Sequence, residues 1–219
     1  MENSSLKHKA TNGIKWSFID NIANSGITFL VGVVLARLLS PTEFGILGLI
    51  AIFINLANTI IDGGFVTALI RKPDSTNEDY NTVFYCNLAI SVFLMIILIL
   101  FSKRISIFFN QPLLASIMPI MSILLLINAF GIIPRTLLVK KIDFKTQSKV
   151  SVIASLGSGI IGIAMALKGY GVWSLVWQQL SRQFLLTFFF WVYVRWIPSF
   201  IFSKESFSDL FGFGSKVLA

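Results

Sequence analysis

The chain has 219 residues, of which 55% are hydrophobic and 13% are charged, and its net charge is +8. Soluble globular domains carry about 25% charged residues, so this composition excludes an ordinary soluble domain. A net charge of +8 would suit nucleic-acid binding, but the basic residues follow a membrane topology instead, and we expect no nucleic-acid partner.

Six hydrophobic stretches follow one another along the chain, and a transmembrane helix needs roughly 20 apolar residues. They comprise residues 14–39, 44–70, 80–101, 112–139, 150–167 and 172–196. A seventh stretch, residues 207–219, is about two-thirds of the required length and is typical of the start of another helix. The sequence therefore predicts an all-α, polytopic transmembrane helix bundle with six complete spans and the start of a seventh.

The domain organisation follows from the same pattern. Residues 1–13 form a basic tail, residues 14–196 the six-helix bundle, and residues 197–219 a linker with the start of the seventh helix. The connecting loops are short, so the functional surface is expected within the bundle. We also expect the chain to be the N-terminal half of a longer transporter.

The basic residues concentrate in alternate loops. One set of loops, which includes the N-terminal tail, carries Lys7, Lys9, Lys15, Arg71, Lys72, Arg135, Lys140, Lys141, Lys145, Lys149, Arg195 and Lys204. The opposite loops carry Arg37, Lys103, Arg104 and Lys168. Since loops rich in Lys and Arg stay in the cytoplasm, the N-terminus is predicted to be cytoplasmic.

Polar residues inside the first two spans need a reason, because a charge at the bilayer centre costs about 2.5 to 3.5 kcal/mol. At helical periodicity, Asp20 and Asn24 share one face of the first span, and Asn55, Asn58 and Asp62 share one face of the second. These two faces are predicted to line a wet cavity.

The sixth span carries a permanent cation. Ser174, Gln178 and Arg182 recur every four residues and therefore share one face. Two interpretations remain open at this point: Arg182 lines an anion-binding lumen, or it pairs with Asp20 or Asp62 to hold helices in register.

Small residues form a stripe along the fifth span. Its members are Ser148, Ser151, Ser155, Ser158, Gly159, Gly162 and Ala166. Such stripes allow close helix packing, which is the favoured interpretation; a substrate groove is the alternative.

Enzymatic motifs are missing from the sequence. A metal site needs three or four converging ligands, whereas the chain has one His and one Cys, and it has no phosphate-binding glycine motif. We therefore expect no catalytic residues, metal or cofactor.

A series of short motifs follows the chain from end to end. It begins with Trp16-Ser-Phe-Ile-Asp20 and Leu35-Ala-Arg-Leu-Leu-Ser-Pro-Thr-Glu-Phe-Gly45. It continues through Asp62-Gly-Gly-Phe-Val-Thr-Ala-Leu-Ile-Arg71 to Gly169-Tyr-Gly-Val-Trp-Ser-Leu-Val176. The series resembles the bacterial polysaccharide flippases of the multidrug/oligosaccharidyl-lipid/polysaccharide exporter superfamily, on the branch that exports O-antigen, capsule or exopolysaccharide.

The resemblance implies a multi-pass protein of the bacterial inner membrane. It would move an undecaprenyl-pyrophosphate-linked oligosaccharide from the cytoplasmic to the periplasmic leaflet by alternating access, beside the polysaccharide polymerase and glycosyltransferases of the same pathway. The cationic residues Arg182 and Lys216 would then attract the pyrophosphate. The neutral polar residues would bind sugars, and the two carboxylates would bind a coupling cation. The neutral set is Asn24, Asn55, Asn58 and Gln178, and the carboxylates are Asp20 and Asp62.

Three alternatives remain. A multidrug exporter of the same superfamily would favour acidic sites over a cationic lumen. A membrane polymerase or glycosyltransferase would need a larger outer loop than residues 102–111. A truncated fragment would have no transport activity by itself, because one six-helix bundle lacks the opposing half of a translocation path.

Overall fold

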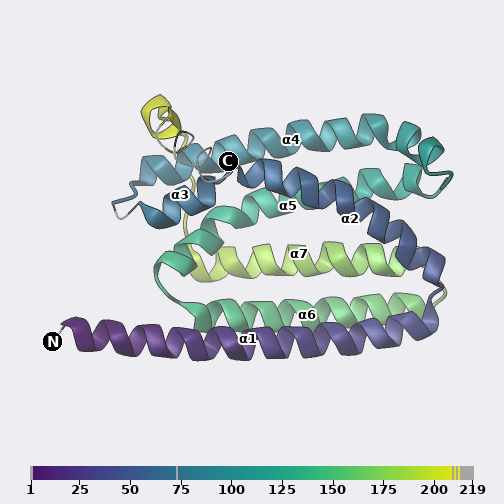
Figure 1. Ribbon diagram of the computed structural model, residues 1–219, viewed down its shortest axis with the longest axis horizontal. Helices are drawn as coiled ribbons and strands as arrows, with labels where there is room; N and C mark the ends of the chain where they lie inside the picture. Colours follow the sequence, from purple (N-terminus) through teal and green to yellow (C-terminus); the bar gives the residue numbers. More distant parts are fainter. Residues whose placement is uncertain (1, 73, 209, 211, 213–219) are drawn as a thin grey trace. The chain divides into compact units, whose positions relative to one another are not determined.

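The computed structural model describes residues 2–72, 74–208, 210 and 212, and within these ranges it contains helices and no strands. The helices are α1 (Glu2–Leu38), α2 (Pro41–Asp62), α3 (Phe65–Arg71), α4 (Asn77–Phe108), α5 (Leu114–Lys140), α6 (Phe144–Leu167) and α7 (Val172–Val194) (Figure 1). The predicted all-α class is confirmed.

Most of these helices are long and apolar enough to cross a membrane. In the described part of the chain, five segments meet both conditions: Asp20–Leu38 of α1, and the whole of α2, α4, α5 and α6. Helix α7 has the length, with 23 residues, but its Gln residues and Arg182 lower its mean hydropathy. The chain is therefore a multi-pass helical membrane protein.

The second predicted span, residues 44–70, is wrong in one respect, because it is two helices rather than one. Helix α2 ends at Asp62 and α3 begins at Phe65. Between them Gly63 and Gly64 have φ angles of +46° and +78°. Glycine adopts this left-handed backbone without steric cost, so the glycine pair allows the helix to break.

The fifth predicted span, residues 150–167, begins earlier than expected, at Phe144. Asp143 explains the start, because its carboxylate accepts hydrogen bonds from the Thr146 backbone N–H at 3.1 Å and from the Thr146 hydroxyl at 2.7 Å. Such a cap satisfies a backbone donor that the first helical turn leaves unpaired. The cap therefore extends the helix into a polar region that hydropathy assigns to a loop.

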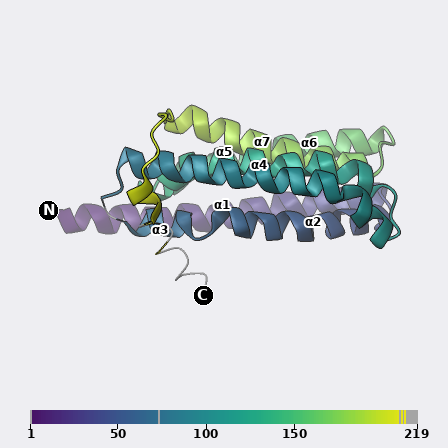
Figure 2. The ribbon, with the colours of Figure 1, turned by 90° about the horizontal axis from the view of Figure 1, so that it is seen from above.

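The chain folds into two compact units. The first comprises residues 1–45 and 137–194, and the second comprises residues 46–136 and 195–219. In the first unit, α6 and α7 run antiparallel and side by side in both views, and α1 packs against α6 (Figures 1 and 2). Helix α6 is thus the middle helix of this unit.

Close approach in the first unit depends on the small residues of α6. A Cβ atom on Gly159 would lie 2.6 Å from Cγ2 of Val31 on α1. A Cβ atom on Gly162 would lie 3.0 Å from Cβ of Gln178 on α7. The predicted packing role of the stripe is confirmed, since α1 and α7 both touch the face where α6 has glycine.

The turns at one end of the first unit are also joined. The Glu43 carboxylate accepts hydrogen bonds from the Ser40 backbone N–H at 2.6 Å and from the Ser40 hydroxyl at 2.9 Å. A Cβ atom on Gly171, whose φ is +57°, would lie 2.5 Å from Oε1 of Glu43. The first turn of α2 therefore contacts the turn before α7, and the positive φ at position 171 favours glycine there.

The predicted seventh helix falls mostly outside the described residues. Residues 204–208 are helical, in agreement with a helix beginning in this region. Lys216 lies outside the described residues.

Candidate functional site

Five polar side chains form a hydrogen-bonded cluster across the first unit. The Asn24 amide group donates to the Asp20 carboxylate and, at 2.6 Å, to the Ser151 hydroxyl. The Ser155 hydroxyl donates to Oδ1 of Asn24 at 2.6 Å, and Nε of Arg182 donates to the Ser155 hydroxyl at 3.4 Å. We call Asp20, Asn24, Ser151, Ser155 and Arg182 the polar cluster; it joins α1 to α7 through α6.

The hydrogen bonds between the two charges all point the same way. The Arg182 guanidinium donates to Ser155, Ser155 donates to Asn24, and Asn24 donates to the Asp20 carboxylate. Hydrogen bonds that follow one another in the same direction polarise each other. Here the cation lies at the donor end of the series and the anion at the acceptor end, and both positions strengthen this polarisation. The polar cluster therefore links one positive and one negative group without direct contact between them.

Two members of the polar cluster lie near the middle of their helices. Arg182 is about 15 Å along the axis from Val172, the first residue of α7, and Ser155 is near the middle of the 24-residue helix α6. Asp20 is instead the first residue of the candidate span Asp20–Leu38. A charge in the middle of a membrane-spanning helix is costly, so Arg182 is expected to be hydrogen-bonded there, as it is to Ser155.

Arg182 uses only part of its hydrogen-bonding capacity. Within the described part of the chain, its one hydrogen bond comes from Nε, and it forms no ion pair. The side chain is exposed in this structure. The terminal nitrogens form the planar fork that matches a phosphate or carboxylate in two parallel hydrogen bonds. Arg182 does not pair directly with Asp20; the two residues are linked through the hydrogen bonds of Ser155 and Asn24. The terminal nitrogens of the guanidinium remain open to an anion, as the other interpretation of Arg182 requires.

Gln178 lies one helical turn before Arg182 on α7. Its Cβ and Cγ atoms would each lie 3.0 Å from a Cβ atom on Gly162. The stem of Gln178 thus packs on α6 in the same unit as the polar cluster.

The predicted residues of the second span belong to the second unit, whereas the polar cluster belongs to the first unit. The Asn128 amide of α5 donates to Oδ1 of Asn58 at 2.9 Å, so Asn58 joins α2 to α5. Asn55 is exposed, and its backbone carbonyl accepts a hydrogen bond from the Thr59 hydroxyl at 2.9 Å.

Asp62 lies where the second span breaks. Its carboxylate lies near the backbone N–H of Val66 in the first turn of α3, and it is attracted by the charge of Arg135 on α5. A carboxylate near the start of a helix interacts favourably with the helix dipole.

Sequence reasoning missed three of the residues that complete these contacts. Ser151 and Ser155 were assigned to packing, and Asn128 was not singled out. A signal existed for the two serines, because they are four residues apart on one helical face. Their partners on α1 and α7 depend on the register between helices, which this spacing does not contain.

Removing the Ser155 hydroxyl is expected to uncouple Arg182 from Asn24. Ser155→Ala should lower the free energy of unfolding by about 0.5 to 1.5 kcal/mol, and a cycle with Asn24→Ala should show coupling of roughly 0.6 kcal/mol, the mean found inside membrane proteins. Unfolding in mixed micelles measures both values. The matched control is Ser158→Ala, because the Ser158 hydroxyl donates within α6, to the Ser155 carbonyl at 3.1 Å. Strictly additive effects of Ser155→Ala and Asn24→Ala would contradict the link.

Fold and site together define a polytopic helical membrane protein with a charge-balanced polar cluster among its helices. Over residues 34–219 the sequence matches the family described as "Polysaccharide biosynthesis protein", and the chain belongs to this family.

Several curated proteins are similar to the chain. The succinoglycan biosynthesis transport protein ExoT of Rhizobium meliloti is 28% identical over 195 residues, which cover 89% of this chain and 40% of ExoT. The teichuronic acid biosynthesis protein TuaB of Bacillus subtilis is 28% identical over 218 residues, 98% of this chain and 45% of TuaB. The lipopolysaccharide biosynthesis protein WzxC of Escherichia coli is 26% identical over 152 residues, 69% of this chain and 31% of WzxC. The chain thus spans less than half the length of these relatives, and no solved structure matches it significantly.

Proposed function

We propose that the chain is part of a transporter, not an enzyme, that moves a lipid-linked oligosaccharide across the bacterial inner membrane during polysaccharide biosynthesis. Membership of the polysaccharide biosynthesis protein family supports this proposal, and the relative ExoT is named as a transport protein. The multi-pass helical fold is compatible with such a role.

The observation that carries the proposal is the state of Arg182. Its Nε atom is engaged with Ser155, which orients the guanidinium, while the rest of the group is open near the middle of α7. A substrate with a pyrophosphate group has the charge and the oxygen geometry that this fork binds. We assign the substrate to the class of undecaprenyl-pyrophosphate-linked repeat units, carried from the cytoplasmic to the periplasmic leaflet by alternating access.

The other predicted residues divide by their contacts. Asn24 has both ends of its amide engaged within the polar cluster, so it orients Asp20 and Ser155 rather than binding sugar. Asn55 is exposed and Gln178 lies beside Arg182 on α7, and both keep the proposed sugar-binding role. Asp20, as the anionic end of the polar cluster, is the better of the two carboxylates for a coupling cation.

The proposed topology rests on the basic loops, with the N-terminus in the cytoplasm. In this orientation the glycosyltransferases that build the repeat unit supply the substrate at the cytoplasmic face. A polymerase then uses it at the periplasmic face.

Deletion of the complete gene that encodes this chain tests the proposal. We expect loss of the corresponding surface polysaccharide and accumulation of its lipid-linked repeat unit on the cytoplasmic leaflet, both reversed by the gene on a plasmid. The control is a strain that also lacks the first glycosyltransferase, in which nothing should accumulate. Normal surface polysaccharide without accumulated intermediate would reject the transport function.

A further inference from the structure

The segment that follows α7, residues 195–203, is non-helical and crosses the start of α4 within the second unit (Figure 2). We call it the connecting segment. Non-helical backbone is costly beside lipid, because each unpaired N–H group in hydrocarbon costs several kcal/mol. Its hydrogen bonds therefore need explanation.

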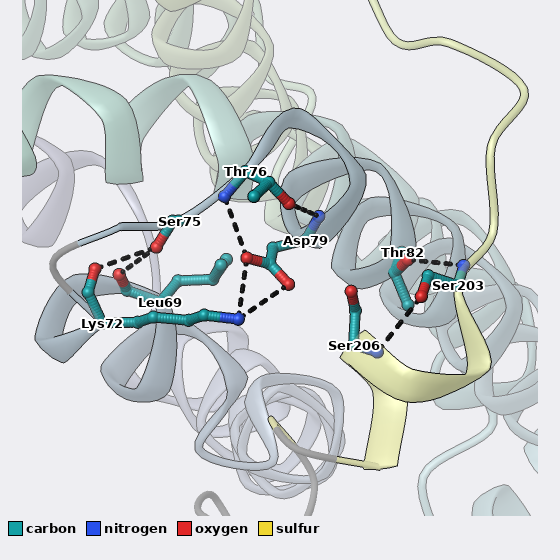
Figure 3. Close-up of polar contacts among 8 residues, drawn as sticks. All are labelled: Leu69, Lys72, Ser75, Thr76, Asp79, Thr82, Ser203 and Ser206. Atoms are coloured by element: carbon teal, nitrogen blue, oxygen red, sulfur yellow. Dashed lines mark hydrogen bonds and ion pairs between the residues drawn. The ribbon is translucent and has the colours of Figure 1, made fainter.

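On the inner side of the connecting segment, side chains of α4 accept hydrogen bonds from its N–H groups. The backbone N–H of Ser199 donates to Oδ1 of Asn81 at 2.8 Å. The backbone N–H of Ser203 donates to the Thr82 hydroxyl at 3.1 Å, as Figure 3 shows. The indole N–H of Trp196 donates to Oδ1 of Asn77 at 3.2 Å. These α4 side chains replace the water that a loop would otherwise use.

The outer side of the connecting segment is apolar and uncovered. Ile197, Phe200 and Phe202 have exposed fractions of 79%, 97% and 54%. Phe200 stacks on Tyr85 of α4, with ring centroids 5.9 Å apart, and yet remains almost wholly exposed. An exposed apolar patch of this kind marks a surface that contacts a membrane or another apolar partner.

The depth of the segment identifies the partner as lipid at the membrane interface. Its hydrogen bonds fall on residues 77, 81 and 82, within about 8 Å of the start of α4, and its ring stack falls on Tyr85, about 12 Å from that start. Helix α4 has 32 residues, or about 48 Å, which exceeds a hydrocarbon core of about 30 Å. The first turns of α4 therefore extend into the headgroup region.

Charged groups in the first turn of α4 and at the two ends of the connecting segment agree with a position in the headgroup region. Asp79, buried in the first turn of α4, forms an ion pair with Lys72 at 3.0 Å and accepts a hydrogen bond from the Thr76 backbone (Figure 3). Arg195 is the first residue of the connecting segment, Lys204 follows its last residue, and both are exposed. Cationic side chains in this position reach lipid phosphates, while a Trp ring such as that of Trp196 is typical of the interface.

We infer that the connecting segment is an interfacial anchor, in which Ile197, Phe200 and Phe202 insert at the boundary between headgroups and acyl chains of a phospholipid bilayer. The inserted side chains gain from burial in lipid, and α4 supplies the hydrogen bonds that lipid cannot. Glu205 follows Lys204, so the local positive charge is small and the apolar side chains carry most of the attraction. This inference goes beyond the proposed transport function and does not depend on it.

Spin-label accessibility tests the anchor in the full-length protein reconstituted in liposomes. The single cysteine, Cys86, is first replaced in Cys86→Ser, and Phe200→Cys or Ile197→Cys is then labelled. Both labels should be relaxed more strongly by oxygen, which partitions into lipid, than by a water-soluble nickel complex, in phosphatidylcholine as well as in phosphatidylglycerol liposomes. Ile197→Cys also protects the test against a folding defect in Phe200→Cys. The matched control is a label at Ser199→Cys, whose backbone is bound to α4 and which should be less accessible to oxygen.

Two results would overturn the inference. Greater relaxation by the nickel complex at positions 197 and 200 would place the segment in water. Low accessibility to both reagents would mean that protein, either a second copy or another part of the same polypeptide, covers the patch. Deletion of the gene has no bearing on this assay, so its failure is separate from failure of the transport proposal.

Discussion

Replacing Arg182 with Gln is expected to reduce polysaccharide export by about 10- to 150-fold, while the abundance of the protein in the membrane stays the same. The change keeps a polar side chain near the Ser155 hydroxyl but removes the charged fork proposed to bind pyrophosphate. Hydrogen bonds to charged groups contribute about 1.5 to 3 kcal/mol, and each 1.4 kcal/mol is tenfold in an equilibrium constant, which gives this range. Surface polysaccharide per cell, normalised to membrane-bound protein, measures the effect.

Two further variants separate geometry from charge. Arg182→Lys keeps the positive charge but lacks the fork and the Nε donor, and we expect an intermediate loss of export. Arg37→Gln removes an exposed cation from the last turn of α1, and export should be unchanged. Full export by Arg182→Gln at equal abundance would reject an anion-binding role for this residue.

Gly159→Ala is expected to destabilise the first unit by about 1 to 3 kcal/mol, the usual effect of an extra methyl group in a packed core. The new Cβ atom would lie 2.6 Å from Cγ2 of Val31, closer than carbon atoms can approach. Val31 cannot rotate away easily, because a β-branched side chain in a helix strongly prefers one rotamer. Helices α1 and α6 must therefore separate, which weakens the packing around the polar cluster. The midpoint of thermal unfolding in detergent should fall.

The chain offers both a control and a rescue for this variant. Gly26→Ala on α1 adds the same methyl group where nothing lies within 4 Å, and it should be neutral or slightly stabilising because alanine favours helix. Val31→Ala removes the clashing methyl groups, so the double variant with Gly159→Ala should recover most of the loss. Equal destabilisation by Gly26→Ala and Gly159→Ala would show that the close contact is not responsible.

Most helices could be predicted from sequence because spanning a membrane leaves a local signal. An apolar run of sufficient length identifies a span without knowledge of its neighbours. The prediction failed at residues 44–70 because hydropathy averages over a window, whereas the break depends on the backbone angles of Gly63 and Gly64. It also missed the early start of α6, where the Asp143 cap, and not apolar content, stabilises the first turn.

Some site residues could be predicted, because the free-energy cost of placing a polar side chain in an apolar span can be recognised from the local sequence alone. Asp20, Asn24 and Arg182 stood out because polar groups in apolar spans are expensive wherever they end up. Their membership of one cluster was not predictable in the same way. Ser155 resembles any small residue of a packing stripe until α1 and α7 are placed on either side of it.

The sequence by itself determined that this is a helical, multi-pass membrane protein, and it indicated which charged residues within the apolar spans demand an explanation, because both follow from the transfer of side chains into lipid. Only the tertiary structure decided which helices meet. The partners of a helix depend on the register and distance of neighbouring faces, and here they follow from the contact of Gly159 with Val31 and from the hydrogen bonds of Ser155. The contacts between α1 and α6 join residues more than 100 positions apart, and Ser155 and Arg182 are 27 positions apart, so no local pattern carries that information.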